Sequence, residues 1–484
     1  MTIDLNGLGI DYGAILPELI VVGAAIVVLF LDLAVPADRR GWLAGVTVVG
    51  LLGALAASFP LWGQSRPAFG DTVVADSLAA FFNVLLIAIT ILTVLISPRF
   101  LRALELDFGE YYVLLLGATA GMMLLAAATS LMTIFLGIEL LSVSLYVLSG
   151  FARTALRSQE AALKYLLLGG FATGFLLYGM ALIYGATGST TLRGIAALTT
   201  AAASSNVLLL AGIALLTVGL AFKVSAAPFH MWTPDVYEGA PTVVTTFMSV
   251  ATKAAAFAAI GRIFIATFPA IWSRWYFALL LIAIGSLFIG NLVAIVQDNI
   301  KRMLAYSGIA QAGYILLGVL PGTTQGFTAT VFYVAAYAVM NFGAFAVVTA
   351  IGAGGEQTED LSYWQGMFHR RPFLATVMTI FMLSLAGIPP TVGFFAKLFV
   401  FQALVTAQLW APLVVAVILT IISFYYYLRV IVVMLAQPDG VVAESRVGFS
   451  TSTVLGAVAV ATVALGFFPS VVLDWASHAA SLHF

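Results

Sequence analysis

The chain has 484 residues, of which 62% are hydrophobic and 8% are charged, and its formal net charge is −1. This composition is typical of a polytopic α-helical membrane protein and excludes an ordinary soluble domain. The near-neutral charge gives no sign of a nucleic-acid partner. The absence of cysteine excludes disulfides, thiolate-held iron–sulfur clusters and thiolate zinc sites from this chain, and the four histidines are too scattered in sequence to indicate a metal site.

Fourteen apolar runs are long enough to cross a hydrocarbon core of ~30 Å. They lie at 14–34, 42–62, 75–97, 110–128, 130–150, 161–184, 207–229, 241–267, 275–297, 302–320, 326–352, 372–406, 408–436 and 450–472. The seventh run ends in Ser225-Ala226-Ala227-Pro228, and Gly387-Ile388-Pro389-Pro390 interrupts the twelfth. In transporters, such breaks in membrane helices mark the pathway. We therefore predict an all-α polytopic membrane protein with about 14 transmembrane helices, of which helices 7 and 12 are broken.

The loop charges predict an orientation. One set of alternating loops and helix ends carries twelve basic residues, namely Arg39, Arg40, Arg99, Arg102, Arg153, Arg157, Lys301, Arg302, Arg370, Arg371, Arg429 and Arg446. The other set carries only Arg66, Arg193, Arg262 and Arg274. Because basic loops stay on the cytoplasmic side, this bias places both termini on the outer side of the cell (inner) membrane.

The four remaining basic residues are all lysines, Lys164, Lys223, Lys253 and Lys397, and they lie within the apolar runs. A charged side chain at the centre of a membrane helix costs ~2.5–3.5 kcal/mol on insertion scales, so intramembrane charges usually have a function. Arginine keeps its proton at any relevant pH, whereas a buried lysine can release it. Lysine is therefore suited to carrying protons. The simpler alternative is that these amines reach the headgroup region, which applies most to Lys164 near the start of its helix.

Among the acidic residues, only Glu139 lies in the middle of an apolar run. Lys164 could pair with Glu160 at the i, i+4 spacing or serve on the pathway. The polar hinge between Pro228 and Pro241 holds His230, a candidate relay group. Further stepping stones along a polar axis are Ser225, Thr252, Tyr306, Ser307, Gln311, Tyr333 and Tyr337, for each of which an ordinary interhelical hydrogen bond is the alternative.

Two pairs of short segments indicate an internal duplication. Val218–Lys223 (VGLAFK) matches Val392–Lys397 (VGFFAK), and YVLSG ending at Gly150 matches YILLG ending at Gly318. The offsets are 174 and 168 residues, so both matches have nearly the same register. An offset of five helices reverses the topology, which predicts inverted repeats of helices 4–8 (110–267) and 9–13 (268–436), with helices 1–3 (1–109) and helix 14 (437–484) outside them.

The residues suggest a proton switch. Burial in apolar surroundings disfavours a charged amine, whereas a nearby carboxylate favours it. If Glu139 approaches Lys223, the lysine holds a proton, and if they separate, the proton passes to Lys253. Lys397 is then the terminal carrier of the second half.

Three blocks of the sequence resemble the antiporter-like membrane subunits of respiratory complex I. They are PFHMWTPDVYEGAPTVVTTFMSVATKAAAFAA (228–259), NIKRMLAYSGIAQAGYILLG (299–318) and LSLAGIPPTVGFFAKLFVFQA (383–403). The resemblance covers nearly the whole chain, and WTPDVYEGAPT together with a lysine at 397 is most similar to subunit N of the proton-translocating NADH:quinone oxidoreductase. One departure is Val243-Val244, where the family commonly has proline followed by valine.

The resemblance implies fourteen helices, inverted repeats and a proton path through Glu139, Lys223, Lys253 and Lys397, with Lys164 often included. It also implies that this chain carries no cofactor, and that NADH, FMN, iron–sulfur clusters and quinone belong to partner subunits. The expected partners are a neighbouring antiporter-like subunit and small membrane subunits. The chain is then a non-redox part of a multi-subunit translocase.

Three alternatives stay open. An Mrp-type cation/proton antiporter would need oxygen ligands for sodium, and intramembrane acids are scarce. A non-conducting assembly scaffold would not need the buried lysines. Quinone binding in this chain has no separate motif to support it.

Overall fold

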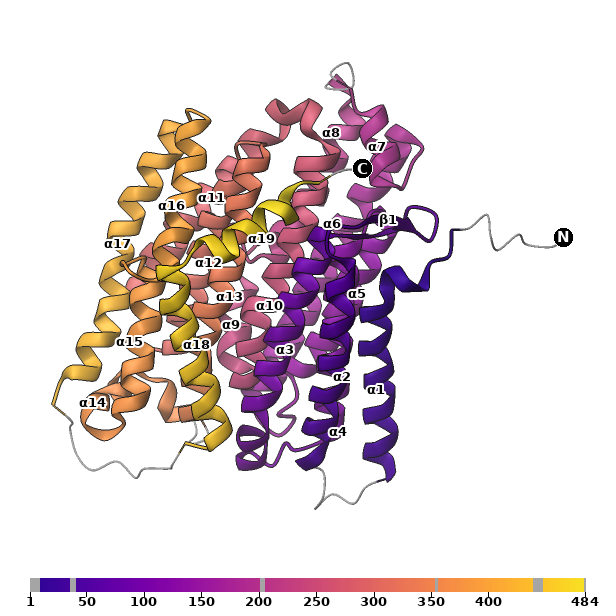
Figure 1. Ribbon diagram of the computed structural model, residues 1–484. Coiled ribbons are helices and arrows are strands. Elements are labelled where there is room, and N and C mark those ends of the chain that lie inside the picture. The colour runs from indigo at the N-terminus through magenta and orange to yellow at the C-terminus, as the bar shows by residue number, and fades with distance from the viewer. Residues whose placement is uncertain (1–8, 35–40, 201–204, 353–355, 438–446, 483–484) are drawn as a thin grey trace.

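The computed structural model describes residues 9–34, 41–200, 205–352, 356–437 and 447–482, which form a bundle of long helices (Figure 1). The helices are α1 (Leu16–Ala34), α2 (Leu43–Ser58), α3 (Ser77–Ala103), α4 (Gly109–Ala127), α5 (Leu131–Ser149), α6 (Leu156–Thr187), α7 (Leu192–Leu198), α8 (Val207–Lys223), α9 (Trp232–Gly239), α10 (Thr242–Ile260), α11 (Trp272–Ile295), α12 (Ile300–Val319), α13 (Thr324–Gly352), α14 (Met367–Arg370), α15 (Pro372–Ala386), α16 (Val392–Thr406), α17 (Trp410–Leu435), α18 (Phe449–Phe467) and α19 (Ser470–Ala480). A short antiparallel hairpin joins β1 (Ser65–Ala68) to β2 (Val73–Asp76).

The prediction of a helical polytopic membrane protein is confirmed. Over the described ranges, eleven helical segments are long and apolar enough to cross a membrane. Three shorter apolar helices, α8, α15 and α16, accompany them. The total of fourteen spans and the inverted repeats stay predictions.

Both predicted interruptions lie where the sequence places them. Helix α8 ends at Lys223, and the chain then turns through Ser225, whose φ is +62°. Helix α15 ends at Ala386, followed by Gly387 at φ +89°, and α16 begins at Val392. Each break therefore leaves backbone carbonyls inside the bundle that need a partner from another element.

Helices α10 and α13 form the centre of the bundle. The most apolar window of α10 and the π-helical turn that follows it is fully buried, and that of α13 is 94% buried. In contrast, α1 and α2 are about a third buried and lie at one side of the bundle (Figure 1). Alanine and threonine are frequent in α10 and α13, α13 also has three glycines, and small residues let helix backbones approach closely in membranes.

The sequence did not reveal three features. One is the hairpin β1–β2, and another is the short helix α7. The third is α19, which lies obliquely across the bundle after α18 (Figure 1) and packs against α3 and α13. The sixth run is also longer than predicted, because α6 spans Leu156–Thr187 rather than 161–184.

Candidate functional site

Three of the predicted lysines have their amines inside the bundle. Lys223 and Lys397 are 4% exposed, and Lys253 is 1% exposed. Within the described part of the chain, none of the three forms an ion pair with a carboxylate. Because a buried unpaired charge is costly, these amines are placed where they can exist without their proton.

Lys223 lies in the last turn of α8 and contacts α5. Its Nζ donates a hydrogen bond to Ser142 Oγ at 2.6 Å, and Nζ is 5.9 Å from the centre of the Tyr146 ring. Glu139 lies three residues before Ser142 on α5 and accepts a hydrogen bond from Thr173 of α6 at 2.8 Å. Glu139 and Ser142, the residue that binds the Lys223 amine, therefore lie one turn apart on the same face of α5. The amine and the Glu139 carboxylate form no direct ion pair.

Lys253 lies near the middle of α10, eleven residues or ~16 Å after its first residue. Its Nζ is 3.4 Å from Tyr337 Oη on α13 and lies over the rings of Tyr237 and Tyr337 at 5.7 and 5.4 Å. Gly308 of α12 makes room for this group, because a Cβ there would lie 2.9 Å from Nζ. The amine is thus flanked by the Tyr337 hydroxyl and by the faces of two tyrosine rings.

Lys397 closes the break between α15 and α16. Its Nζ donates to the carbonyl oxygens of Ala386 at 2.7 Å and Leu385 at 3.2 Å. These carbonyls belong to the last turn of α15, where the helix dipole is negative. The Tyr314 ring lies 4.9 Å from the amine. The helix break therefore supplies the neutral acceptors that hold this amine.

A hydrogen-bonded network leads away from Lys397. Gln311 Nε2 donates to the same Leu385 carbonyl at 3.1 Å and to Tyr427 Oη at 3.0 Å. Tyr333 donates to Gln311 Oε1 at 2.6 Å, and Ser307 Oγ lies 2.6 Å from Tyr427 Oη. Three predicted stepping stones thus lie in one network. Tyr427 connects them, but it was missed because it lies in the aromatic run FYYYLR, which reads as core.

Lys223 and Lys253 are connected by aromatic side chains. The Tyr146 ring lies 4.8 Å from Tyr165, which stacks on Trp232 at 4.5 Å. Trp232 is 6.1 Å from Tyr237, beside Lys253. No sequence pattern indicates this row, because its members come from three different helices, α5, α6 and α9.

The other predicted relay residues are Ser225, fully buried in the turn after α8, Tyr306, which packs against the hydrophobic core, Thr252 and His230. Thr252 donates to the Met248 carbonyl within α10 at 2.6 Å. His230 is half-buried between α8 and α9, and no described contact connects it to the lysines. Its relay role stays a prediction.

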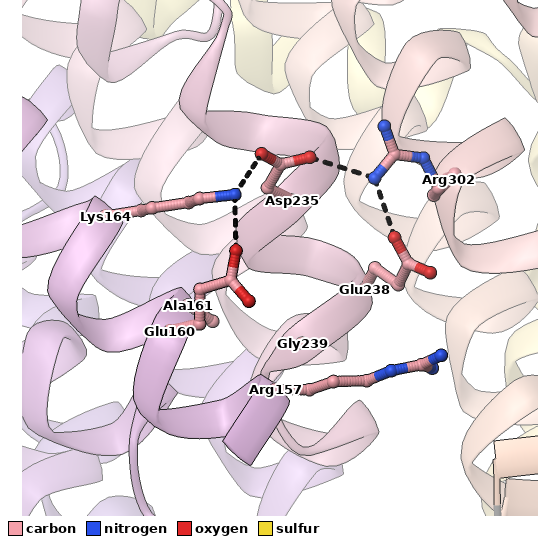
Figure 2. Close-up of a pocket in the computed structure, with 8 residues that line it drawn as sticks. All are labelled: Arg157, Glu160, Ala161, Lys164, Asp235, Glu238, Gly239 and Arg302. Atoms are coloured by element: carbon pink, nitrogen blue, oxygen red, sulfur yellow. Dashed lines mark hydrogen bonds and ion pairs between the residues drawn. The ribbon is translucent and has the colours of Figure 1, made fainter.

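Lys164 lies in a cluster of charges contributed by α6, α9 and α12 (Figure 2). Its Nζ is 2.8 Å from both Glu160 and Asp235, so the predicted i, i+4 pair is confirmed. Asp235 also binds Arg302 at 2.9 Å, and Arg302 binds Glu238 at 2.6 Å. Burial raises the pKa of the Asp235 carboxyl, but the hydrogen bonds from Lys164 and Arg302 outweigh this and hold that pKa below its usual range. The cluster surrounds a cavity of about 260 Å³ and joins α6, α9 and α12.

Two of the basic residues that the sequence placed in loops or at helix ends are buried. Arg262, 2% exposed, forms a two-point ion pair with Asp76 at 2.8 Å for each bond. Lys301, 1% exposed, lies 3.0 Å from Glu359. Both lie at helix ends, as predicted, Lys301 at the start of α12 and Arg262 just after α10, but hydrophobicity alone does not show that a helix end folds into the bundle. Both cations have an acidic partner, unlike Lys223, Lys253 and Lys397.

Together, the broken helices and buried amines define a polytopic membrane protein of the antiporter-like class. Residues 128–423 match the family described as "NADH:quinone oxidoreductase/Mrp antiporter, TM". The chain belongs to this family.

Relatives match along almost the full length. "NADH-quinone oxidoreductase subunit N" of Trichlorobacter lovleyi is 46% identical over 480 residues, which cover 98% of each chain. "NADH-quinone oxidoreductase subunit N 1" of Herpetosiphon aurantiacus is 45% identical, with 93% of each chain covered. A chain of respiratory complex I from Thermus thermophilus with bound Aureothin is 35% identical with a TM-score of 0.81, covering 95% of this chain and 98% of that one. A chain of the Mrp complex from Dietzia sp. has a TM-score of 0.85 at 24% identity, covering 98% and 97%, and supports the fold alone.

Proposed function

We propose that the chain is a proton-translocating membrane subunit of an NADH:quinone oxidoreductase of the complex I type. The observation that carries this proposal is the set of three amines, Lys223, Lys253 and Lys397, each buried beside tyrosine and without an acidic partner among the described residues. The near full-length relatives named subunit N support the parent complex.

The proposed route uses Glu139 and Lys223, then Lys253, then Lys397. Lys223 donates to Ser142 on the helix of Glu139, so a small movement of α5 or α8 would change the distance between amine and carboxylate. When they approach, the amine keeps its proton, and when they separate, desolvation favours release toward Lys253. Lys164, in its charged cluster, supplies protons to the first half of the route. His230, at the hinge, is a side branch of the proton route.

The arrangement in the membrane is part of the proposal. Residues 110–267 and 268–436 form two inverted repeats, flanked by 1–109 and 437–484, with fourteen spans in all. Matching hexapeptides beside the two helix breaks support this duplication. The loop charges support an orientation with both termini on the outer side and Lys301 and Arg302 toward the inner side.

The chain does no redox chemistry itself in this proposal. NADH, FMN, iron–sulfur clusters and quinone lie on partner subunits, and their reactions drive the movement of protons here. The lack of cysteine supports the exclusion of iron–sulfur clusters from this chain. The neighbours are another antiporter-like subunit and small membrane subunits, within the lipid bilayer.

The test is Lys253→Ala in the assembled complex, with NADH oxidation and proton uptake measured together in inside-out vesicles. We expect proton uptake per electron to fall while the complex stays assembled, because the central carrier is gone. Unchanged uptake would instead support a scaffold. An Mrp-type antiporter predicts a sodium-dependent pH change in vesicles that contain this chain alone. We expect no such change, because Glu139 is the one acid that the sequence places at mid-membrane depth.

A further inference from the structure

A row of polar side chains runs along one face of α10 and ends at Lys253. Its members are Thr242, Thr246, Ser249 and Lys253, at the spacing i, i+4, i+7 and i+11. This spacing places all four on one helix face, over a length of ~16 Å. All four are buried, as is the whole of α10. Hydrophobic periodicity could not identify this face because no face of α10 is exposed.

Helix α13 presents matching polar groups to this row. Thr349 Oγ1 lies 2.9 Å from Thr246 Oγ1. Asn341 Nδ2 donates to Ser249 Oγ at 3.0 Å. Tyr337 Oη lies 3.4 Å from Lys253 Nζ. The α10–α13 contact therefore carries three polar rungs in order, which we call the polar ladder.

The far end of the polar ladder opens into a cavity of about 250 Å³. Thr242 and Gly352, the terminal residues of α10 and α13 at this end, both line it. Lys301 and Glu359, the buried ion pair, line the same cavity. Lys301 Nζ also donates to the carbonyls of Glu238 and Ala240, which fixes the end of α9 beside the opening. Loop charges assign this end to the inner side of the membrane.

One atom of the polar ladder is left without a partner. Asn341 is fully buried, and no group in the described chain bonds its Oδ1. Buried polar atoms are paired in nearly all cases, so an unpaired amide oxygen needs an explanation. Hydrogen bonds that serve only to hold two helices together would not require this oxygen, nor a cavity at one end and an amine at the other. A water or hydrated proton on the ladder would satisfy it.

We propose that the polar ladder takes up protons from the inner cavity and delivers them to Lys253. This inference rests on the proposed function and adds to it a second entry to Lys253, beside the transfer from Lys223. Water molecules between the rungs pass the proton from the cavity toward Lys253. Each of the hydroxyls of Thr246 and Ser249 accepts one proton and releases another. Neutral Lys253 Nζ gains the proton and becomes an ammonium group, with no oxidation or reduction. Asn341 is a positioning residue, because it holds Ser249 and offers Oδ1 to the hydrated proton.

The absence of cysteine allows a direct test of hydration. Thr246→Cys, Ser249→Cys and the control Ala251→Cys are introduced singly into the full complex. Ala251 is equally buried and lies on another face of α10, two residues or ~3 Å further along the helix than Ser249. Vesicles of either orientation are treated with the cationic aminoethyl methanethiosulfonate, with free cysteine as scavenger on the opposite side. The mass added to this subunit is then followed over time.

We expect Thr246→Cys to react from the inner side faster than Ser249→Cys, and both to react about tenfold faster than Ala251→Cys, because only the row is wetted from the cavity. Reaction of Thr246→Cys no faster than that of Ala251→Cys overturns the proposal. Faster reaction from the outer side overturns it as well.

A functional measurement separates this inference from the proposed function. Thr246→Val keeps the shape of the side chain, and combined with Ser249→Ala it removes both hydroxyls. We expect the rate of proton uptake to fall about tenfold, because each lost hydrogen-bonded step raises the barrier to proton transfer by about one buried hydrogen bond. If this variant pumps normally while Lys253→Ala does not, the polar ladder is wrong and the proposed function stands. If Lys253→Ala pumps normally, the proposed function itself fails, whatever the labelling shows.

Discussion

Two kinds of buried cation occur in this bundle, and their surroundings differ. Arg262 and Lys301 each contact a carboxylate, at 2.8 Å from Asp76 and 3.0 Å from Glu359. Lys223 and Lys397 instead contact neutral oxygens, from a serine hydroxyl and from backbone carbonyls. A carboxylate partner keeps a cation charged, whereas neutral acceptors leave the proton free to depart. In the proposed function, pairing with a carboxylate therefore separates the cations that hold the fold from the cations that carry protons.

The chemistry of the side chains agrees with this division. Arg262 binds Asp76 through two parallel bonds, which the planar guanidinium favours, and donates a third to the Ala126 carbonyl at 2.8 Å. It therefore joins the end of α10 to α3 and α4. Lysine, which can be deprotonated when buried, occupies the unpaired positions. The comparison predicts that the two kinds of site respond in opposite ways to substitution.

The largest expected effect on stability comes from breaking the Arg262–Asp76 pair. Asp76→Ala leaves Arg262 charged and buried without its partner and also removes the N-cap of α3. We expect a loss of about 3–5 kcal/mol in the free energy of unfolding, measured by thermal inactivation of the assembled complex. The matched control is Asp76→Ala combined with Arg262→Met, which removes both charges and should recover most of the loss. Equal losses in the single and double variants would contradict the role assigned to the pair.

An unpaired lysine should behave in the opposite way. Lys223→Met removes a buried amine without stranding any carboxylate, so we expect unchanged or higher stability together with loss of proton uptake. The control is Lys301→Met, which strands Glu359 and should destabilise the subunit. Both are measured by thermal inactivation and by proton uptake per electron. If Lys223→Met destabilises the subunit as much as Lys301→Met, the comparison fails.

A smaller effect is expected where only the position of the amine changes. In Gly308→Ala, the new Cβ would lie 2.9 Å from Lys253 Nζ and 3.0 Å from Tyr337 Oη, so the flexible amine must move away. We expect proton uptake to slow about fivefold, equivalent to one lost hydrogen bond, with little change in stability. Gly170→Ala is the control, because a Cβ there meets no atom within 4 Å. Identical rates of proton uptake in the two variants would show that the position of the Lys253 amine beside Gly308 does not affect proton transfer.

The smallest effect is expected at the half-exposed cluster. Lys164 is 40% exposed, and Asp235 keeps its bond to Arg302 when Lys164 is replaced by alanine. We expect a loss of about 0.2–1 kcal/mol in the free energy of unfolding, which salt reduces further. Thermal inactivation at low and high ionic strength checks this. A loss as large as that of Asp76→Ala would place Lys164 among the structural cations.

Sequence predicted the helical bundle and its breaks well, because apolar length and proline or glycine act locally. It also singled out Lys223, Lys253 and Lys397, since a charge within a long apolar run is visible without any structure. It did not show that Arg262 and Lys301 are buried, because their burial depends on Asp76 and Glu359, which are 186 and 58 residues away in the chain. Tyr427 and the polar ladder were missed for the same reason. The periodicity of one helix does not show which residues of another helix it contacts.

The most direct test of the central claim is Lys253→Arg in the assembled complex, measured as protons taken up per electron from NADH. Arginine keeps a positive charge and a hydrogen-bond donor at this position, but it does not release its proton. If a proton must leave the amine at residue 253, proton uptake should fall as far as in Lys253→Ala while NADH oxidation shows that the complex is assembled. Normal uptake in Lys253→Arg would show that a fixed charge is sufficient and would contradict the account.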